Sequence, residues 1–320
     1  MGKTDWKVSV VITTHNRSGL LLRAINSVVL QTYKNLEIIV IDDNSTDDTE
    51  SVVKAIQKRD SRILYYRITP EETKGGNFAR NKGIKLSTGY VVAFLDDDDE
   101  WLKEKIEIQV QYLMNHLEIK AISSDLEYVF VIDEKEYITY SNMKINREEN
   151  DFFVSSWMNV TSTMMVYRDL LIQIGGFDEN IPAIQEIELS YRICMNCKVA
   201  LIKKPLIRYY QYLSDKNQIT NNVNKYLIAL DYIENKYKNE LLHLNKNQLE
   251  KMRLNTTYNI AFRYLRALDN KKYRKTLKKN INKYGSKIKL EYFLSYFFSY
   301  PTIIKIKSFF ITIKSLRENI

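Results

Sequence analysis

The chain has 320 residues, of which 45% are hydrophobic and 27% charged, and this composition excludes a chain that stays disordered for lack of a core. Its formal charge of +9 is divided unevenly, because residues 1–215 hold 26 Lys and Arg against 32 Asp and Glu (−6), while residues 216–320 hold 22 against 7 (+15). The acidic part is expected to need a cation, and the basic part is expected to attract anionic lipid, nucleic acid or polyphosphate.

The first hundred residues predict four strands that alternate with helices. Apolar runs of strand length occur at 8–12, 36–41, 63–68 and 91–95. Helical patterns follow the first three runs, over 21–29, after 45–46 and over 78–86. Such a series predicts an α/β fold with a mostly parallel sheet, whose ligands bind at the carboxyl ends of the strands.

Polar residues follow three of these strands, at 13–17, 42–46 and 96–99. The third group is the most acidic, and its four aspartates repel one another unless a cation or a partner offsets their charge. Carboxylates suit Mg²⁺ or Mn²⁺, and Mg²⁺ usually completes its shell with water and substrate phosphates. A metal site for a phosphate-bearing substrate is therefore expected, and an exposed acidic turn without a ligand is the alternative.

Three common site motifs are absent from the sequence. It has no GxGxxG after its first strand, no GxxxxGK[ST] and no GxSxG, which excludes a dinucleotide-binding motif, a P-loop and the nucleophile elbow of hydrolases.

Shorter elements are predicted beyond residue 100. A helix over 101–117 precedes strand segments at 121–122, 128–132, 137–140 and 164–167, with a hairpin turn at 133–136. A strand follows over 202–212, then helices over 223–238, 246–268 and 271–283, with a break at Gly285-Ser286. The two cysteines, Cys194 and Cys197, lack the further ligands of a zinc site and are expected to be structural.

Four segments resemble the motifs of the inverting family 2 glycosyltransferases, nucleotide-sugar-dependent enzymes with the GT-A fold. They are VSVVITTHNR (8–17), LEIIVIDDNSTDDT (36–49), GGNFARNKGI (75–84) and FLDDDDEW (94–101). The resemblance departs from the family at His15, where tyrosine is usual, and it fades near residue 212. It implies a GT-A catalytic domain over 1–215, with a nucleotide-sugar half at about 1–100 and an acceptor half at about 101–215, followed by a basic helical region over 216–320.

The resemblance also implies roles for individual residues. Asp96 and Asp98 would be the DXD carboxylates that bind the divalent metal, Mg²⁺ or Mn²⁺. Contacts with the nucleotide sugar are expected from Thr13, His15, Asn16, Arg17, Asp42, Asp43, Arg80, Asn81, Asp96 and Asp97.

A catalytic base is expected in QEIELSYR (185–192), which follows GGFDE (175–179). In the family an acidic residue stands there six positions before an arginine, and in this chain that residue is Glu186. The acceptor hydroxyl that attacks the sugar must lose its proton to such a base. Glu188 diverges from Glu186 by about 200° on a helix, so an acceptor or structural contact is expected for it instead. Trp157 is a second expected acceptor contact, and the alternative for Glu186 is a carboxylate that serves only the helix dipole.

The expected function is inverting, metal-dependent transfer of a sugar from a UDP-sugar to a saccharide or lipid-linked saccharide, in the synthesis of cell-surface or capsular polysaccharide. A nucleotidyltransferase is one alternative, because such enzymes also gather carboxylates at strand ends. A nucleic-acid-binding protein is another, because the region 216–320 is basic with interleaved aromatics. No RNP, KH or zinc-finger pattern occurs, so a nucleic-acid partner is not expected. Homo-oligomerisation stays open.

The segment 288–316 is rich in Phe, Tyr, Ile and Leu, but Glu291, Lys305, Lys307 and Lys314 interrupt its long apolar runs, so it is expected to be too charged to span a bilayer. Its pattern predicts either a helix in the interface of an anionic membrane or a helix pair packed on the protein. The start of the chain has no long apolar run of a secretory signal. The expected location is the cytoplasm, with peripheral contact to the inner face of the cell membrane.

Overall fold

The computed structural model describes residues 5–140, 153, 158, 160–212 and 223–318. Four parallel strands form the first half of its sheet, in the order β3-β2-β1-β4. They are β1 (Val8–Thr14), β2 (Leu36–Asp42), β3 (Ile63–Arg67) and β4 (Val91–Asp96). Thr14 pairs with Asp42 and Thr13 with Asp96, so the polar ends of these strands meet at one edge of the sheet, as predicted.

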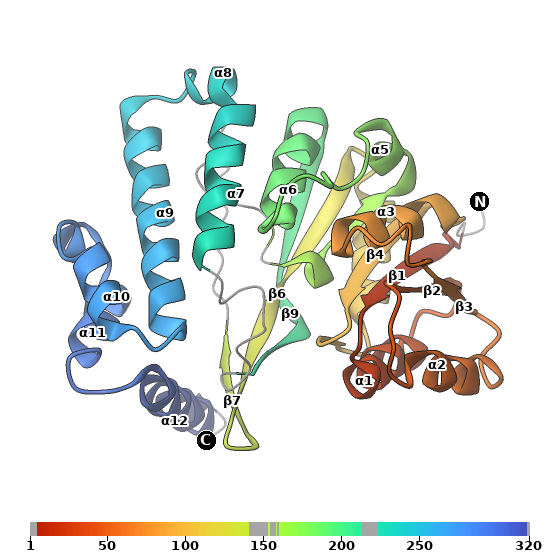
Figure 1. Ribbon diagram of the computed structural model, residues 1–320, viewed down its shortest axis with the longest axis horizontal. Coiled ribbons are helices and arrows are strands. Elements are labelled where there is room, and N and C mark those ends of the chain that lie inside the picture. Colours follow the sequence, from red (N-terminus) through yellow and green to blue (C-terminus); the bar gives the residue numbers. More distant parts are fainter. Residues whose placement is uncertain (1–4, 141–152, 154–157, 159, 213–222, 319–320) are drawn as a thin grey trace.

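Helices cover both faces of this half-sheet (Figure 1). Helices α1 (Ser18–Val29) and α2 (Thr49–Gln57) lie on one face, and α3 (Gly76–Leu86) and α5 (Arg168–Gln173) lie on the other. Helix α6 (Gln185–Asn196) lies against the second half of the sheet. Burial on both faces explains why the strands are almost continuously apolar. Helix α3 approaches β1 closely at Gly83, where a Cβ atom would lie 2.3 Å from a methyl carbon of Val11.

The second half of the sheet is mixed and continues in the order β8-β6-β9-β5, with β7 paired to β6; the described residues thus give one sheet of nine strands. The elements are β5 (Glu100–Trp101), α4 (Lys105–Asn115), β6 (Ile119–Ile132), β7 (Lys135–Tyr140), β8 (Met165–Tyr167) and β9 (Lys198–Tyr212). The prediction of two separate strands at 121–122 and 128–132 was wrong. The polar residues between them pair with β9 through register shifts, which makes β6 continuous.

Six helices of the described chain follow the sheet: α7 (Val223–Lys236), α8 (Lys238–Leu241), α9 (Lys246–Arg266), α10 (Asn270–Leu277), α11 (Ser286–Leu294) and α12 (Tyr300–Glu318). A capping box between Asn245 and Gln248 fixes the start of α9. Helices α7 and α9 stand side by side next to α6, and α10 to α12 lie beyond them (Figure 1). The predicted helical region is therefore present, whereas a boundary at 215/216 stays a prediction because it falls among residues that are not described.

Two apolar clusters join these helices to the rest of the molecule. In one, Phe130 and Ile132 of β6 pack with residues of α9, α10 and α12, among them Leu265 and Tyr300. In the other, Ile184 and its neighbours before α6 pack with α7. The first turn of α12 is buried in this way, which supports the packed-helix alternative for that part of 288–316. No helix among the described residues is long and apolar enough to cross a membrane.

Candidate active site

A cavity of about 660 Å³ lies at the carboxyl edge of the parallel strands, and its volume is typical of a site for a small ligand. Its walls come from the loops after β1, β2 and β4, the start of α3, the segment before α6, and helices α7 and α9. Many residues that the sequence singled out line it together: Thr13, His15, Arg17, Asp43, Arg80, Asp96, Asp97, Asp98 and Glu186. The fold thus gathers most of the predicted donor site around one space.

The aspartates after β4 point in different directions. Asp96 accepts a 2.6 Å hydrogen bond from Nη2 of Arg80. Arg17 Nη1 lies 3.2 Å from a carboxylate oxygen of Asp97 and 3.1 Å from one of Asp98. Asp99 is buried on the other side of the turn, where the Ser162 hydroxyl donates a 2.5 Å hydrogen bond to it. Three carboxylates therefore line the cavity, and the fourth fixes the turn that presents them.

The carboxylates at the cavity fit a divalent cation. Burial, followed by the charges of Asp97 and Asp96, raises the pKa of Asp98 to about 7. The side chains of Asp96 and Asp98 keep 26% and 19% of their surface exposed, so both can reach a ligand in the cavity. Among the described residues no three His, Cys, Asp or Glu side chains converge to hold a metal by themselves. Mg²⁺ often uses only one or two carboxylates and takes its other ligands from substrate phosphates and water.

Two predicted nucleotide contacts hold the loops instead of lining the cavity. Asp42 is buried and accepts hydrogen bonds from the Tyr65 hydroxyl at 2.6 Å and from the Ser45 amide at 2.8 Å. Asn16 accepts a 2.7 Å hydrogen bond from the Thr46 amide, which ties the loop after β1 to the loop after β2. In the same region Nδ1 of His15 lies 2.7 Å from the carbonyl oxygen of Asp43. These bonds set the shape of the site, and a nucleotide contact for Asp42 or Asn16 stays a prediction.

Asn81 also acts on the site from behind the cavity wall. Its side-chain oxygen accepts a 2.8 Å hydrogen bond from the amide of Phe177, and its nitrogen donates a 2.9 Å bond to the carbonyl of the same residue. Gly176 permits this clamp, because a Cβ atom there would lie 2.4 Å from Oδ1 of Asn81 and the backbone has a φ of +67°. The clamp fixes the 175–179 loop on α3 and thereby places the segment that leads to Glu186.

Glu186 lies in the first turn of α6 and is half-buried at the cavity. Burial raises its pKa, and the charges of Arg80 and Arg263 offset this only in part. A carboxylate with a raised pKa that faces a ligand cavity is suited to accept a proton near neutral pH.

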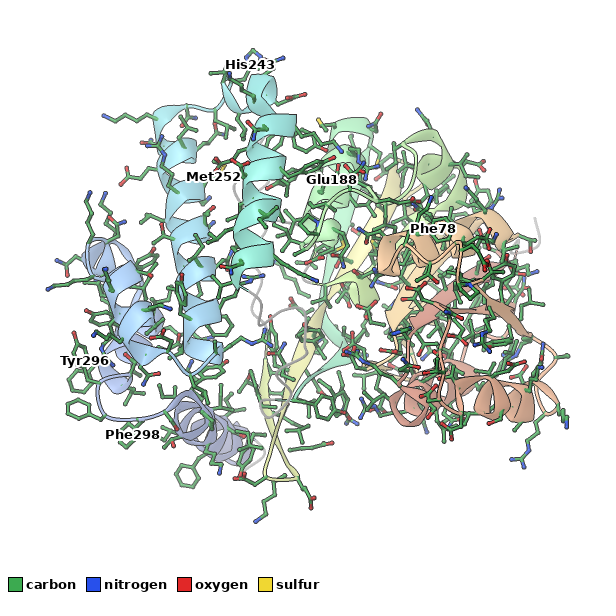
Figure 2. The ribbon with its side chains drawn as sticks, in the orientation of Figure 1. Phe78, Glu188, His243, Met252, Tyr296 and Phe298 are labelled. Carbon is green, nitrogen blue, oxygen red and sulfur yellow. The ribbon has the colours of Figure 1, made fainter. Side chains whose placement is uncertain are left out.

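Glu188, on the same helix, is fully buried between α6 and α7 (Figure 2). Its oxygens accept hydrogen bonds from Arg192 at 2.5 Å, Lys236 at 2.7 Å and the Tyr237 hydroxyl at 2.7 Å. This arrangement argues against the acceptor contact expected for Glu188 and supports its structural alternative. The other expected acceptor residue, Trp157, lies outside the described residues.

The basic helical region reaches the site, and this contribution was not predicted from the sequence. Lys225 and Tyr226 of α7 and Arg263 of α9 line the same cavity as the aspartates. The guanidinium carbon of Arg263 lies 3.5 Å from the centre of the Tyr226 ring, a cation–π geometry that holds the arginine in place. Alternating aromatic and basic residues were the only sequence signal, and that pattern does not specify which helix face meets the sheet.

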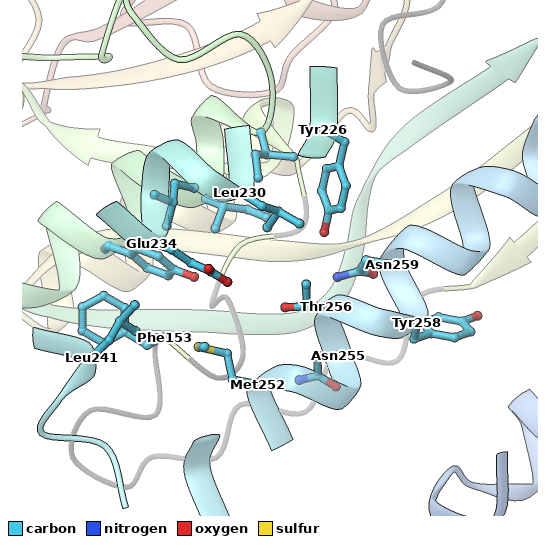
Figure 3. A pocket seen from close by; sticks show the side chains of 14 residues that line it. Phe153, Tyr226, Leu230, Glu234, Leu241, Met252, Asn255, Thr256, Tyr258 and Asn259 are labelled. Carbon is cyan, nitrogen blue, oxygen red and sulfur yellow. The ribbon is translucent and has the colours of Figure 1, made fainter. Parts of the chain in front are cut away.

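A second cavity, of about 200 Å³, adjoins the first and shares Ile184 and Tyr226 with it. It lies between α6, α7 and α9, and Figure 3 shows side chains of α7 and α9 facing each other across it. Its lining is mainly apolar, with Asn255, Thr256 and Asn259 contributed by α9.

Comparisons with known proteins agree with this fold. The model of the family described as glycosyl transferase family 2 matches residues 9–175. An uncharacterized glycosyltransferase of Rickettsia felis is 29% identical over 98% of this chain and 49% of its own length. A GalNAc(5)-diNAcBac-PP-undecaprenol beta-1,3-glucosyltransferase of Campylobacter jejuni is 47% identical over 33% of this chain and 34% of its own. The UDP-Glc:alpha-D-GlcNAc-diphosphoundecaprenol beta-1,3-glucosyltransferase WfaP of Escherichia coli is 35% identical over 46% of this chain and 49% of its own length. The chain thus spans about half the length of these curated relatives or less.

Solved structures share the fold at low sequence identity. Residues 1–349 of Staphylococcus aureus TarS in complex with UDP-GlcNAc align with a TM-score of 0.59 and 15% identity, over 86% of this chain and 80% of that one. The mannosyltransferase PcManGT of Pyrobaculum calidifontis, in complex with GDP-Man and Mn²⁺, aligns with a TM-score of 0.60 and 16% identity. The alignment covers 98% of this chain and 88% of that one. Because the family model matches more than half of the chain and the sheet has the arrangement of these structures, the chain belongs to glycosyl transferase family 2 and has the GT-A fold.

Proposed function

We propose that the protein transfers a sugar from a nucleotide sugar, with a UDP-sugar as the expected donor, to a hydroxyl group of a saccharide acceptor with inversion of configuration. One observation carries the proposal: the three aspartates, Arg80, Arg263 and Glu186 line a single cavity at the carboxyl edge of the sheet. The aspartates, through a bound cation, and the arginines suit the binding of a diphosphate. The carboxylate of Glu186 suits proton transfer.

The donor diphosphate would lie between the aspartates and the helical region. Asp96 and Asp98 would hold a divalent cation, which when bound offsets the negative charge that develops on the leaving diphosphate. Arg263 supplies a fixed positive charge from the other wall, because its stacking on Tyr226 holds its guanidinium at the cavity. Arg80 donates a hydrogen bond to Asp96 and thereby orients that carboxylate.

The transfer step needs one base and no covalent intermediate. The acceptor oxygen attacks the anomeric carbon, its proton passes to a carboxylate oxygen of Glu186, and the bond from the anomeric carbon to the β-phosphate oxygen breaks. The nucleoside diphosphate then leaves from the face opposite to the attack, which inverts the anomeric configuration. The raised pKa of Glu186 favours its role as proton acceptor at the pH of the cell.

A lipid-linked saccharide is the proposed acceptor class, and polysaccharide synthesis is the proposed setting. The names of the C. jejuni and E. coli relatives state that they act on undecaprenol-diphosphate saccharides, and the E. coli name also states a UDP-glucose donor. Membership of the family argues against both alternatives from the sequence, the nucleotidyltransferase and the nucleic-acid-binding protein.

Incubation with a panel of UDP- and GDP-sugars, with Mg²⁺ or Mn²⁺ and with EDTA as a control, tests the proposal. We expect metal-dependent release of nucleoside diphosphate from at least one donor, increased by a saccharide acceptor, and a product whose anomeric configuration is inverted. Release of sugar 1-phosphate in place of the nucleoside diphosphate would indicate nucleotidyl transfer or hydrolysis of the diphosphate bond. A product that retains the donor configuration would contradict the single-base mechanism.

A further inference from the structure

Exposed apolar side chains gather where helix α11 ends. Phe297 is 67% exposed, Phe293 58% and Tyr296 57%, and Leu290 and Phe298 lie beside them in sequence and are also exposed. The ring centres of Phe293 and Phe297 are 5.2 Å apart, and those of Phe297 and Phe298 are 6.5 Å apart. We call these five residues the aromatic patch. A contiguous group of this kind differs from the single exposed apolar residues that any surface carries.

The fold holds the aromatic patch outward. The Asn270 side chain donates hydrogen bonds to the carbonyl oxygens of Ser295, at 3.0 Å, and Phe298, at 2.9 Å. Arg274 also donates to the carbonyl of Ser295, and its guanidinium lies 4.5 Å from the ring centre of Tyr296. These contacts pin the turn after α11 to α10. In Figure 2, Tyr296 and Phe298 lie at the outer edge of the helical region, on the side away from the sheet.

The inner side of α11 is anchored independently of the aromatic patch. Glu291 is buried and accepts hydrogen bonds from the Tyr273 hydroxyl, at 3.2 Å, and from Lys307. The buried Tyr300 and Ile304 begin α12 in the same cluster. Of the predicted segment 288–316, the first turn of α12 thus packs on the protein, whereas the end of α11 and its following turn present apolar side chains to solvent, as does Phe309 farther along α12.

Positive charge is concentrated in the helices that lead to the aromatic patch. Residues 270–300 contain nine Lys and Arg and a single acidic residue, Glu291, whose carboxylate is buried and paired with Lys307. The exposed lysines of α10 and α11 and of the segment between them are Lys271, Lys272, Lys275, Lys278, Lys279, Lys283, Lys287 and Lys289. Lys272 pairs with Asp269 and Lys283 with Glu250. The exposed side of these helices therefore combines apolar rings with an excess of positive charge.

We propose that the aromatic patch docks the protein on the surface of an anionic lipid bilayer. Four of its five side chains, Leu290, Phe293, Phe297 and Phe298, have no polar atom, which suits the boundary between headgroups and acyl chains. The flanking lysines then lie at the level of the anionic headgroups, where each contributes to attraction. An acidic protein surface would match the lysines but would leave the rings without an apolar partner. The inference goes beyond the proposed glycosyl transfer and does not depend on it.

Co-sedimentation of the full chain with vesicles tests the inference, using phosphatidylcholine alone and phosphatidylcholine with about one third phosphatidylglycerol. The variant is Phe293→Ser/Phe297→Ser, which changes two exposed rings and leaves the buried side of α11 intact. The matched control is Leu117→Ser/Leu242→Ser, because these leucines are 60% and 75% exposed at other positions. Donor hydrolysis in solution and circular dichroism show whether each variant keeps its fold and its activity.

We expect the unchanged protein and the control to bind the anionic vesicles, less as salt rises, and to bind the neutral vesicles weakly. The Phe293→Ser/Phe297→Ser variant should lose about tenfold or more in partition to the anionic vesicles while donor hydrolysis is unchanged. Equal binding of this variant and the control would overturn the inference. So would a dimer, measured by light scattering, that dissociates only in this variant while neither protein binds vesicles, since the patch would then join two copies of the chain. Loss of donor hydrolysis in the unchanged protein would affect the proposed function and leave the vesicle result standing.

Discussion

The guanidinium of Arg263 on α9 stacks at 3.5 Å on the ring of Tyr226 on α7, and both residues line the cavity that the strand-end aspartates also line. The basic helical region thus forms one wall of the site. Burial lowers the pKa of Arg263, and the charge of Glu186 acts against this decrease. An anionic ligand in the cavity would offset the buried charge of this arginine, which is why we assign it to the diphosphate of the donor.

Substitution Arg263→Ala should raise the KM for the nucleotide sugar by about tenfold or more, because a charged hydrogen-bond donor to the diphosphate is removed. The measurement is initial-rate kinetics with varied donor. Arg253→Ala is the matched control, since Arg253 is exposed on the same helix and does not line the cavity. An unchanged KM in Arg263→Ala would show that α9 closes the cavity without binding the donor.

Substitution Asp98→Ala should abolish turnover and leave the melting temperature unchanged or higher. The change removes a metal carboxylate, and it also relieves the repulsion from Asp97 and Asp96 that, together with burial, raises the pKa of Asp98. Thermal unfolding and donor turnover with Mg²⁺ or Mn²⁺ measure the two effects, with Asp231→Ala, at an exposed position of α7, as the control. Turnover close to that of the unchanged protein would exclude Asp98 as a metal ligand.

Substitution Glu186→Gln should lower kcat by about 10²-fold or more while donor affinity changes little, because the amide cannot accept the acceptor proton. The base acts in its ionised form, and its pKa is raised by burial, so the rate should fall as the pH decreases through this raised pKa. A pH–rate profile of kcat/KM should show this acidic limb in the unchanged protein and lose it in the variant. A parallel loss of donor binding and turnover would place Glu186 in the donor pocket instead.

Substitution Glu188→Ala should lower the free energy of unfolding by about 3 kcal/mol, because it leaves Arg192 and Tyr237 without their buried partner. Burial alone would raise the pKa of Glu188, but hydrogen bonds from Arg192, Lys236 and Tyr237 outweigh it and lower the pKa. The stabilising contribution is therefore present above the unfolded-state pKa, near 4.3, and is lost as the pH falls through the lowered folded-state pKa.

Denaturant unfolding at neutral and acidic pH measures this effect, with Glu118→Ala at an exposed position as the control. The difference between Glu188→Ala and the unchanged protein should shrink below about pH 4. A difference that is constant with pH, or activity lost with full stability, would contradict a structural role for Glu188.

The parallel half of the sheet could be predicted because its pattern is local. Each strand is a short apolar run that ends in polar residues, and parallel strands must place those ends at one edge. The continuity of β6 could not be read in this way, because the mostly polar residues 123–126 gain their strand partners from β9, about eighty positions later. The same limit explains why no role was predicted for Asp99: its partner Ser162 is distant in sequence.

The contribution of α7 and α9 to the site was missed for a related reason. Arg263 and Lys225 belong to a region with many basic residues, and only the packing of Ile184 and its neighbours on α7 determines which of them face the cavity. The different orientations of Glu186 and Glu188 could be predicted, because two residues that are two positions apart point to different sides of a helix. One of them lines the cavity and the other is buried against α7.

The central claim is that the strand-end aspartates and Arg263 bind one nucleoside diphosphate between them. Titration calorimetry with UDP and GDP in the presence of Mg²⁺ tests it most directly, on the unchanged protein and on the Asp98→Ala, Arg263→Ala and Glu186→Gln variants. We predict that one of the two nucleotides binds, that Asp98→Ala and Arg263→Ala each weaken this binding by about tenfold or more, and that Glu186→Gln does not. Binding that is indifferent to both Asp98 and Arg263, or no binding of either nucleotide to the unchanged protein, would contradict the account.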